Sequence, residues 1–415
     1  MKRVGYIFAL AFLPVFNLGC SEKASVDKPI DNDPPALTEV DSKLVAAGNE
    51  FTWELFREVV RSEETNAAKN IFLSPLSASI ALGMTYNGAR GETQTAMQST
   101  LGFSDVTPLQ INESYQNLIA HFAGLDANVK FEIANSIWHA NWFEVEPEFL
   151  DVNRRYFDAV VSTLDFSSPE AVVTINDWVS DRTNGKIATI LESIPDNTVM
   201  YLINALYFKG TWTYKFARAK TRPMEFNCPD GRKPTCQFMS MRSDSVRFIW
   251  NSSVTGIELP YGSGDYRFLA VMPTHHDSTI DALVAGLDGD TWTNWLASLN
   301  HRDDLLMLPK FKLSYETNLK DQLSSLGMGV AFTDQADFTG INRNGNLLIT
   351  AVKQKTFVQL DEEGTEAAAV TAVEVGITNA GPSFVFDRPF LMTIYDHQSG
   401  AVLFIGKIVK PEFSS

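Results

Sequence analysis

The stretch that most constrains the fold is residues 361–381, DEEGTEAAAVTAVEVGITNAG, because its charges follow a period of two. In a strand, alternate side chains face opposite sides. One face would carry only uncharged residues, namely Thr365, Ala367, Ala369, Thr371, Val373, Val375 and Ile377. The other face would take both glutamates, in the set Glu366, Ala368, Val370, Ala372, Glu374, Gly376 and Thr378. This pattern predicts a strand with one buried side.

The composition of the same stretch indicates a different structure. Ala favours helices and is a poor strand former, so local preference and binary pattern disagree. Such divided preference is expected of a segment that adopts two conformations. An Ala-rich helix or a disordered linker is the alternative, and the stretch taken alone favours that alternative.

The composition of the whole chain limits the classes of protein to which it can belong. Its 415 residues are 45% hydrophobic and 11% aromatic, which is enough for a large core and excludes a disordered scaffold. The formal net charge is −16, and no basic cluster interrupts this balance. The charge therefore disfavours nucleic acid, heparin-like polyanions and anionic membrane surfaces as partners.

The N-terminus has the pattern of an export signal. Lys2 and Arg3 precede an apolar run, residues 4–16, that is short for a membrane span and fits a signal peptide. A small residue followed by Cys20 then resembles the bacterial lipoprotein signal, in which that Cys becomes the lipidated first residue. Asn17 departs from the hydrophobic residue usual three places before the Cys. The alternative is a secreted protein cleaved nearby, with Cys20 incidental.

The segment after Cys20 is predicted to be a tether. It contains Pro29, Pro34 and Pro35, many acids and little apolar content. From about residue 43 the composition stays uniform, with no second linker and no repeat. We predict a signal peptide at 1–19, a lipidated tether at 20–43 and one domain at 44–415, held on the outer membrane or cell surface through the lipid on Cys20.

Two further cysteines, Cys228 and Cys236, flank a turn signal in the sequence PDGRKPT. Facing strand positions across a hairpin are close enough for a disulfide, and an exported protein meets oxidants. We therefore expect a disulfide, with two free thiols as the alternative. A metal site is not expected, because there is no Cys-x-x-Cys motif and no His nearby.

Helical and strand patterns are mixed along the chain. Helical periodicity is found over residues 44–60, 77–86 and 176–183. Strand patterns are found over residues 202–210, 256–273, 304–313, 355–360 and 400–409. Because the two do not alternate steadily as in βαβ units, we predict an α+β fold.

The sequence gives no sign of an enzyme. It contains no G-x-S-x-G elbow, no phosphate-binding G-x-x-x-x-G-K-[ST] loop, no H-E-x-x-H motif and no G-x-G-x-x-G before a helix. The 6 histidines show no metal-ligand spacing. We predict no catalytic residues, no cofactor and no metal; a hydrolase with an unrecognised site is the alternative.

Long segments of the chain nevertheless resemble one family, the serpins. The similar segments lie in serpin order at residues 70–103, 175–187, 202–212, 308–328 and 386–411, and the resemblance extends from Ala46 to Pro411. It implies three β-sheets, eight or nine helices and an exposed reactive loop. The family traps proteases: the target cleaves the loop and forms an acyl-enzyme, and the cut loop then inserts into the main sheet. The implied partner is a target protease in a covalent complex with a serpin monomer.

Residues 361–381 correspond to the reactive loop in this resemblance, and the period of two is the face pattern of the strand that the loop becomes. Extended at about 3.3 Å per residue, the chain from Thr365 to Thr378 spans roughly 46 Å, about one domain width. Inhibitory serpins resemble one another in a Glu-x-Gly-Thr-Glu hinge followed by small residues. The matching residues here are Glu362, Gly364, Thr365, Glu366, Ala367, Ala368 and Ala369. The resemblance thus implies an inhibitor, with a non-inhibitory serpin cleaved as a plain substrate as the alternative.

The register of the family places the scissile bond at Thr378-Asn379, with one residue either way open. It is set by the distance from Gly364 to the segment DRPF at residues 387–390. A neutral, β-branched Thr378 suits elastase-like or subtilisin-like pockets and does not suit trypsin-like ones, which require a cation. Ile377 also suits papain-like cysteine proteases, which select a hydrophobic residue there.

Five other positions match the region of a serpin where the main sheet opens. Ser74, Ser77 and Asn204 match its polar cluster, and Trp212 matches the aromatic residue at its top. The family's usual His in this cluster is Gln354 here. Because Gln both donates and accepts, we expect the network without the pH dependence that the His confers. For each position, ordinary core packing or turn chemistry is the alternative.

Overall fold

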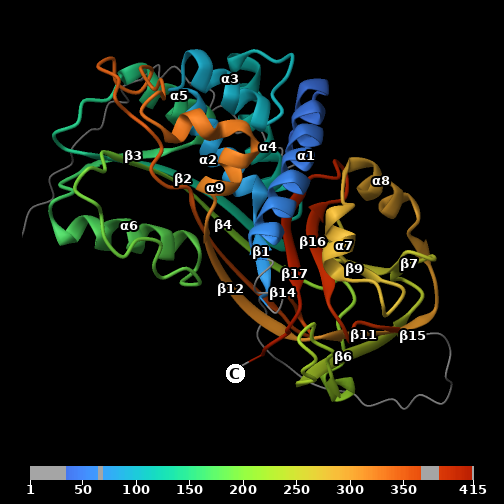
Figure 1. Cartoon of the computed structure of the whole chain (residues 1–415). Coiled ribbons are helices and arrows are strands. Elements are labelled where there is room, and N and C mark those ends of the chain that lie inside the picture. Colours follow the sequence, from blue (N-terminus) through green and yellow to red (C-terminus); the bar gives the residue numbers. More distant parts are fainter. Residues whose placement is uncertain (1–33, 64–68, 366–382, 414–415) are drawn as a thin grey trace, which may run out of the picture. The chain divides into compact units, whose positions relative to one another are not determined.

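The computed structural model describes residues 34–63, 69–365 and 383–413. Within this part of the chain there are nine α-helices: α1 (Glu39–Ser62), α2 (Pro75–Tyr86), α3 (Gly91–Thr100), α4 (Pro108–Gly124), α5 (Pro147–Phe157), α6 (Pro169–Arg182), α7 (Ile280–Ala285), α8 (Gly289–Ala297) and α9 (Lys320–Leu323) (Figure 1). No described helix has both the length and the apolar character that crossing a membrane requires.

The strands form three sheets. The first, in spatial order, is β1 (Ile71–Leu73), β17 (Val402–Ile408), β16 (Phe390–Asp396), β9 (Tyr266–Pro273), β8 (Val254–Pro260), β7 (Arg247–Trp250) and β10 (Asn300–His301). The second is β15 (Ser383–Val385), β11 (Asp304–Pro309), β6 (Thr235–Ser243) and β5 (Arg222–Glu225). The third is β12 (Phe311–Asn318), β13 (Lys353–Leu360), β14 (Gly364–Thr365), β4 (Met200–Thr211), β2 (Val129–Ala140) and β3 (Val160–Leu164). Three sheets and nine helices confirm the predicted α+β class.

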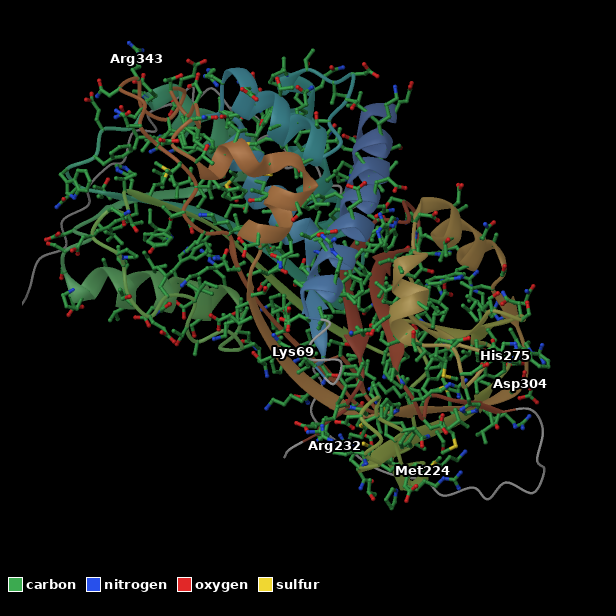
Figure 2. The ribbon with its side chains drawn as sticks, in the orientation of Figure 1. Lys69, Met224, Arg232, His275, Asp304 and Arg343 are labelled. Atoms are coloured by element: carbon green, nitrogen blue, oxygen red, sulfur yellow. The ribbon has the colours of Figure 1, made fainter. Side chains whose placement is uncertain are left out.

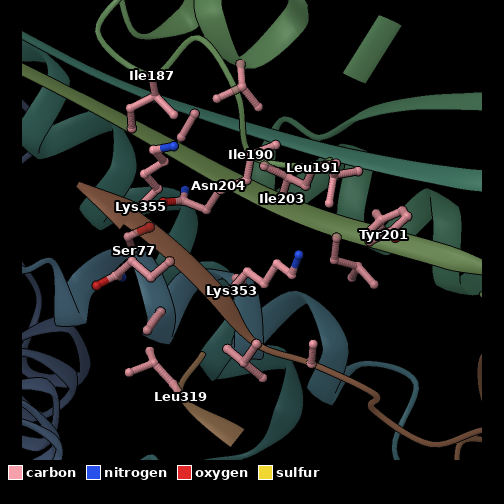
Figure 3. A pocket seen from close by; sticks show the side chains of 18 of the residues that line it. Ser77, Ile187, Ile190, Leu191, Tyr201, Ile203, Asn204, Leu319, Lys353 and Lys355 are labelled. Carbon is pink, nitrogen blue, oxygen red and sulfur yellow. The ribbon is translucent and has the colours of Figure 1, made fainter. Parts of the chain in front are cut away.

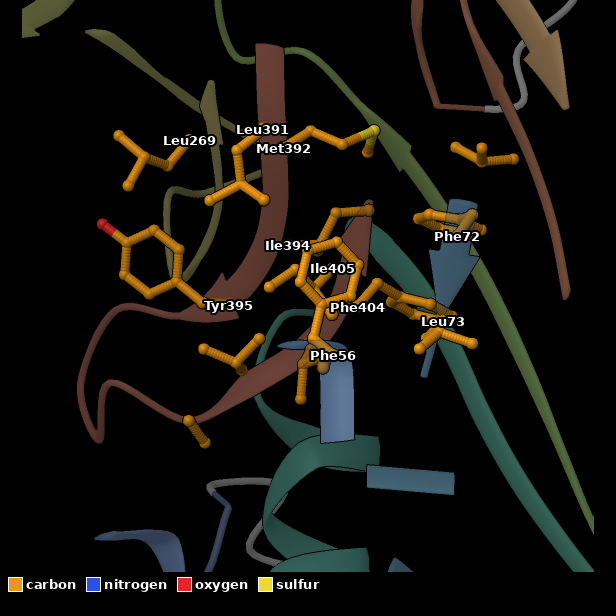
Figure 4. Close-up of a cluster of buried hydrophobic side chains, with 14 of the residues drawn as sticks. Phe56, Phe72, Leu73, Leu269, Leu391, Met392, Ile394, Tyr395, Phe404 and Ile405 are labelled. Carbon is orange, nitrogen blue, oxygen red and sulfur yellow. The ribbon is translucent and has the colours of Figure 1, made fainter. Parts of the chain in front are cut away.

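The core lies between α1, α2 and the seven-stranded sheet. Figure 4 shows part of it, where Phe56 of α1 meets side chains of β1, β16 and β17. The rings of Phe72 and Phe404 stack with centroids 5.5 Å apart. A second, separate cluster covers the other face of the six-stranded sheet: on β2, Ile137 belongs to the main core and its neighbour Trp138 to the cluster under α6. The six-stranded sheet is therefore packed on both faces.

The folded domain begins earlier than predicted. Helix α1 starts at Glu39, inside the segment that we assigned to the tether (20–43). Its N-cap is Thr38, whose hydroxyl accepts from the Asp41 N–H at 3.1 Å while the Asp41 carboxylate accepts from the Thr38 N–H at 2.8 Å. The apolar period starts only at Leu44, so the sequence pattern did not reveal this reciprocal capping box.

The disulfide that we expected between Cys228 and Cys236 is wrong, because both thiols are free and buried. The hairpin register pairs Cys236 on β6 with Met224 on β5, while the Cys228 N–H donates to the Arg232 carbonyl across the turn. The two cysteines therefore do not face one another. The Cys236 thiol instead donates to the Pro411 carbonyl at 3.2 Å, and burial raises its pKa to about 11.

A buried histidine joins the N-terminal segment to the body of the domain. His121 on α4 has Nδ1 3.0 Å from the Pro35 carbonyl and Nε2 3.3 Å from an oxygen of Asp396. Both partners are acceptors, so only the doubly protonated imidazolium can donate to both. Burial by itself would lower the pKa of His121, but these two bonds and the nearby carboxylates of Asp396 and Asp41 outweigh it, and the pKa is raised.

We expect this contact to make stability depend on pH. Because the pKa of His121 is raised on folding, its contribution is complete below about pH 6.5 and is lost as the pH rises through the folded-state value. The pKa of Asp396 is lowered, so its contribution is lost only in acid, below about pH 4. His121→Gln should therefore unfold at a lower temperature than wild type at pH 5.5, and the difference should shrink at pH 9.

Thermal unfolding followed by circular dichroism at the two pH values measures this effect. His276→Gln, at an exposed position in the segment after β9, is the control and should match wild type at both. An equal difference between His121→Gln and wild type at pH 5.5 and pH 9 would contradict the role of the charged imidazole.

Candidate functional site

A short strand, β14, lies between β13 and β4 in the middle of the six-stranded sheet. The chain leaves β13 at Leu360, turns over Asp361–Gly364 and returns so that Thr365 pairs with Leu360 on one side and Gly210 on the other. The turn is closed by backbone bonds between Asp361 and Gly364, 3.0 Å and 3.3 Å long. Thr365, the first residue of the predicted inserting strand, and the hinge residue Gly364 before it are thus already part of the sheet.

Gly364 is required by the geometry of this turn. Its φ is +151°, a conformation that L-residues with a side chain rarely adopt. A Cβ at this position would lie 2.1 Å from the Gly210 carbonyl oxygen and 2.7 Å from the Thr211 Cα. Both neighbours are backbone atoms of β4, so they cannot rotate away as a side chain would. Any larger residue would force β14 away from β4.

Thr365 is buried, with 3% of its surface exposed. Its hydroxyl lies 2.5 Å from the hydroxyl of Tyr261, whose ring stacks on Trp212 at a centroid distance of 4.4 Å. Burial raises the pKa of Tyr261, so the phenol stays protonated. The first residue of the predicted uncharged face is therefore inside the sheet, against an aromatic pair.

The two glutamates before Gly364 anchor the turn. Buried Glu362 accepts from Lys310 and from Thr221, each at 2.7 Å. Burial would raise the pKa of Glu362, but these two hydrogen bonds outweigh it and the pKa is lowered, so the carboxylate stays ionised. Glu363 pairs with Lys215 at 2.7 Å. These contacts fix the turn that precedes β14.

A cavity of about 590 Å³ extends from Thr365 along β4 and β13 (Figure 3). In the described part of the chain, β13 and β4 are joined only through β14, at Leu360, Gly364 and Thr365. The lining includes Leu206 and Phe208 of β4, Phe357 of β13 and Ser77 of α2. Beyond Thr365, β13 and β4 are therefore not paired with each other in the described part of the chain, and the cavity lies between them.

Four of the five residues predicted for the sheet-opening region line this cavity: Ser74, Ser77, Asn204 and Gln354. Gln354 donates to the Ser74 carbonyl at 2.7 Å and accepts from the Ser74 N–H at 3.1 Å. The Ser74 hydroxyl donates to the Leu403 carbonyl at 2.8 Å and accepts from the Ser77 N–H. Gln354 thus ties β13 to the start of α2.

Two of the five predicted residues, Asn204 and Trp212, lie on β4 and directly after it. Asn204 donates to the Asn135 side chain at 2.7 Å, while its own oxygen has no hydrogen-bond partner among the residues described. Trp212 is not among the residues that line the cavity, and its indole N–H donates to the Asp361 carbonyl at 2.9 Å. Trp212 therefore contacts the turn before β14 and not the polar cluster.

The sequence analysis missed Tyr261, Thr221 and Lys310. Each contacts the hinge across more than 50 positions of sequence, and neither a motif nor a period marks its role there. The remaining predicted positions lie outside the described residues: Glu366, Ala367, Ala368, Ala369, Thr378, Asn379 and Cys20. In the ranges that are described, no three His, Cys, Asp or Glu residues gather as a metal site would require.

Comparison with known proteins places the chain in a family. A family model described as "Serpin (serine protease inhibitor)" matches residues 46–411. Iripin-2 of Ixodes ricinus is 32% identical over 381 residues, covering 89% of this chain and 94% of that protein. The leukocyte elastase inhibitor of Xenopus laevis is 32% identical over 379 residues, covering 89% and 99%.

A solved structure agrees with these relatives. The native state of the thermophilic serpin tengpin superposes with a TM-score of 0.79 at 32% identity, covering 91% of this chain and 97% of tengpin. The family is one of protease inhibitors and not of enzymes, in agreement with the lack of a catalytic motif in the sequence. With its three sheets, its hinge between β13 and β4 and a family match over most of its length, the chain belongs to the serpin family.

Proposed function

We propose that the protein is an irreversible, suicide-substrate inhibitor of serine proteases with elastase-like or subtilisin-like specificity. The catalytic serine of the protease attacks the carbonyl of Thr378, the bond to Asn379 breaks, and an acyl-enzyme forms. The freed chain up to Thr378 then inserts between β13 and β4 and carries the protease with it. Trapping succeeds when insertion is faster than hydrolysis of the acyl-enzyme.

The position of β14 is the observation that carries this proposal. Gly364 and Thr365 already pair with β4 and β13, and the cavity of about 590 Å³ continues in the same direction. The uncharged face that begins with Thr365 suits the mostly apolar lining that β4 provides, although β13 also places Lys353 and Lys355 at the cavity (Figure 3). The elastase-like preference is supported by Thr378 and by the name of the Xenopus laevis relative. Papain-like cysteine proteases are a second target class, because Ile377 suits their pockets.

A panel of serine and cysteine proteases tests the function. Inhibition by trapping gives a covalent complex that survives a denaturing gel, and mass spectrometry of the released peptide locates the cut. A non-inhibitory serpin would be cleaved without forming this complex. Complete cleavage by every protease of the panel with no stable complex would therefore refute the proposal.

The side chain of Thr378 should determine the target. The protease pocket binds this side chain before trapping begins, so Thr378→Arg should lower the rate of inhibition of elastase-like enzymes and raise it for trypsin-like ones. Placing an Arg opposite the buried carboxylate of a trypsin-like pocket should change the ratio of the two rates by at least 100-fold, or about 2.7 kcal/mol. The second-order rate constants of inhibition measure the change. An unchanged ratio, or a cut mapped elsewhere, would place the scissile bond at another residue.

We further propose that Cys20 is lipidated and that the domain is held on an outer membrane or cell surface. The basic start, the short apolar run and the small residue before Cys20 support this. Lipid provides an anchor that the net charge of −16 would not provide by attraction to anionic lipids. Secretion without an anchor is the alternative.

Cys20→Ser should release the protein from the membrane. Without the thiol no lipid is attached, so the protein should move from the membrane pellet to the soluble fraction on centrifugation. Cys228→Ser, which changes a buried thiol of the domain, is the control and should stay in the pellet. A wild-type protein found in the soluble fraction would refute the anchor.

A further inference from the structure

An exposed tryptophan lies next to the strand where the reactive loop ends. Trp250, the last residue of β7, has 63% of its surface exposed. Exposure alone does not mark a site, but Trp and Arg are among the residues most enriched at the positions that dominate binding energies.

Arg302 joins Trp250 to the end of the loop. Its guanidinium carbon lies 5.5 Å from the ring centroid of Trp250 and 6.0 Å from that of Phe384. Phe384 belongs to β15, which begins at Ser383, directly after the loop segment. The ring of Phe384 also packs on Phe248 of β7 at 4.5 Å. Trp250 and Arg302 are thus coupled by contacts to the strand that holds the far end of the loop.

Arg302 is held in place before any partner arrives. Its Nε donates to the Asp304 carboxylate at 2.6 Å, and Asp304, labelled in Figure 2, begins β11, the neighbour of β15. The Arg302 side chain is still 37% exposed. An arginine already fixed between two rings and a carboxylate loses little conformational freedom on binding. Trp250 and Arg302 together have the character of a preformed contact site.

A protease at Thr378-Asn379 would reach this site. The chain from Asn379 to Ser383 can span at most roughly 13 Å. A protease domain of about 220 residues has a radius of gyration of about 17 Å, so its surface extends past Ser383 on that side. Because this side carries the residues after the cut, Trp250 and Arg302 would contact the protease before cleavage.

We propose that Trp250 and Arg302 form a second contact surface for the target protease, on the side of the residues that follow the scissile bond. This inference rests on the proposed function for the location of the protease. The surface binds an aromatic or acidic patch of the protease through the indole face and the remaining guanidinium N–H groups. It strengthens the initial complex and takes no part in loop insertion.

The test measures binding to pancreatic elastase whose catalytic serine is replaced by alanine, so that no acyl-enzyme forms. Trp250→Ala should raise the Kd at least tenfold. Trp142→Ala is the matched control, because Trp142 is equally exposed at 64% but follows β2, next to the edge strand β3, which Figure 1 shows on the other side of the molecule from β15. It should change the Kd less than twofold. Arg302→Lys keeps the charge but loses the planar stacking group, and it should also weaken binding.

The trapping assay with active elastase separates this inference from the proposed function. Trp250→Ala should slow association while leaving the number of inhibitor molecules consumed per protease unchanged. Equal Kd values for Trp250→Ala and Trp142→Ala, or no measurable binding of the wild type, would overturn the contact surface. A tenfold loss of binding in a protein that forms no covalent complex would support the contact surface and refute the trapping function.

Discussion

Replacing Thr365 with Arg is expected to turn the protein from an inhibitor of its target protease into a substrate. Thr365 is buried beside Tyr261 at the head of the cavity, so an Arg there must bring a cation into an apolar layer. Even partial desolvation of the cation costs on the order of several kcal/mol. Each 1.4 kcal/mol that is added to the barrier of insertion slows insertion about tenfold. Hydrolysis of the acyl-enzyme should then be faster than insertion.

Cleavage at Thr378-Asn379 should continue in this variant while the covalent complex disappears from the denaturing gel. Two variants serve as controls. Glu366→Arg places the same charge on the face that we predict to point to solvent after insertion, and it should still trap. Thr365→Val keeps the size and removes only the hydroxyl, and it should also trap. Equal loss of trapping in Thr365→Arg and Glu366→Arg would refute the face assignment, and full inhibition by Thr365→Arg would refute insertion.

Gly364→Ala is expected to impair trapping nearly as much, for a steric reason. A methyl group at this position would meet the Gly210 carbonyl oxygen at 2.1 Å, and the backbone conformation itself disfavours Ala. Strain of this kind costs about 1–3 kcal/mol, and relief requires β14 to leave β4. Insertion would then have to start without β14 already paired to β4, and we expect its rate to fall about tenfold.

The measurement is the number of inhibitor molecules consumed per trapped protease, which should rise several-fold for Gly364→Ala. Gly185→Ala is the control, because Gly185 also has a positive φ, +74°, but has nothing within 4 Å of the added methyl. It should lower the free energy of unfolding by about 1–2 kcal/mol and leave trapping unchanged. If Gly364→Ala traps as efficiently as wild type, the pairing of β14 is not needed for insertion.

Sequence reasoning succeeded where the information is local. The helical pattern of residues 77–86 and the strand pattern of residues 202–210 correspond to α2, which is buried on nearly all sides, and to β4, whose buried residues largely alternate. The resemblance of longer segments to the serpins then implied three sheets and eight or nine helices, which no local pattern contains. Without them the Ala-rich loop would have remained an expected helix or linker.

Sequence reasoning failed where distant parts of the chain meet. The disulfide was wrong because the β5–β6 hairpin pairs Cys236 with Met224, four residues before Cys228, and the turn signal between the two cysteines does not fix that register. The domain boundary was wrong because a polar capping box starts α1 before its apolar period begins. Tyr261 and Lys310 were missed because their role comes only from where β8 and β11 end relative to the hinge.

The pairing of β14 has a kinetic consequence. Starting a new strand between two others costs chain entropy before it gains hydrogen bonds, much as the first turn does in helix formation. With Gly364 and Thr365 already paired, this nucleation step is complete, and insertion is a propagation that runs from Glu366 towards Thr378. Substitutions early in that order should therefore alter the rate of insertion, whereas those near Ile377, apart from their effect on which protease binds, should alter the stability of the finished complex and not the rate of insertion.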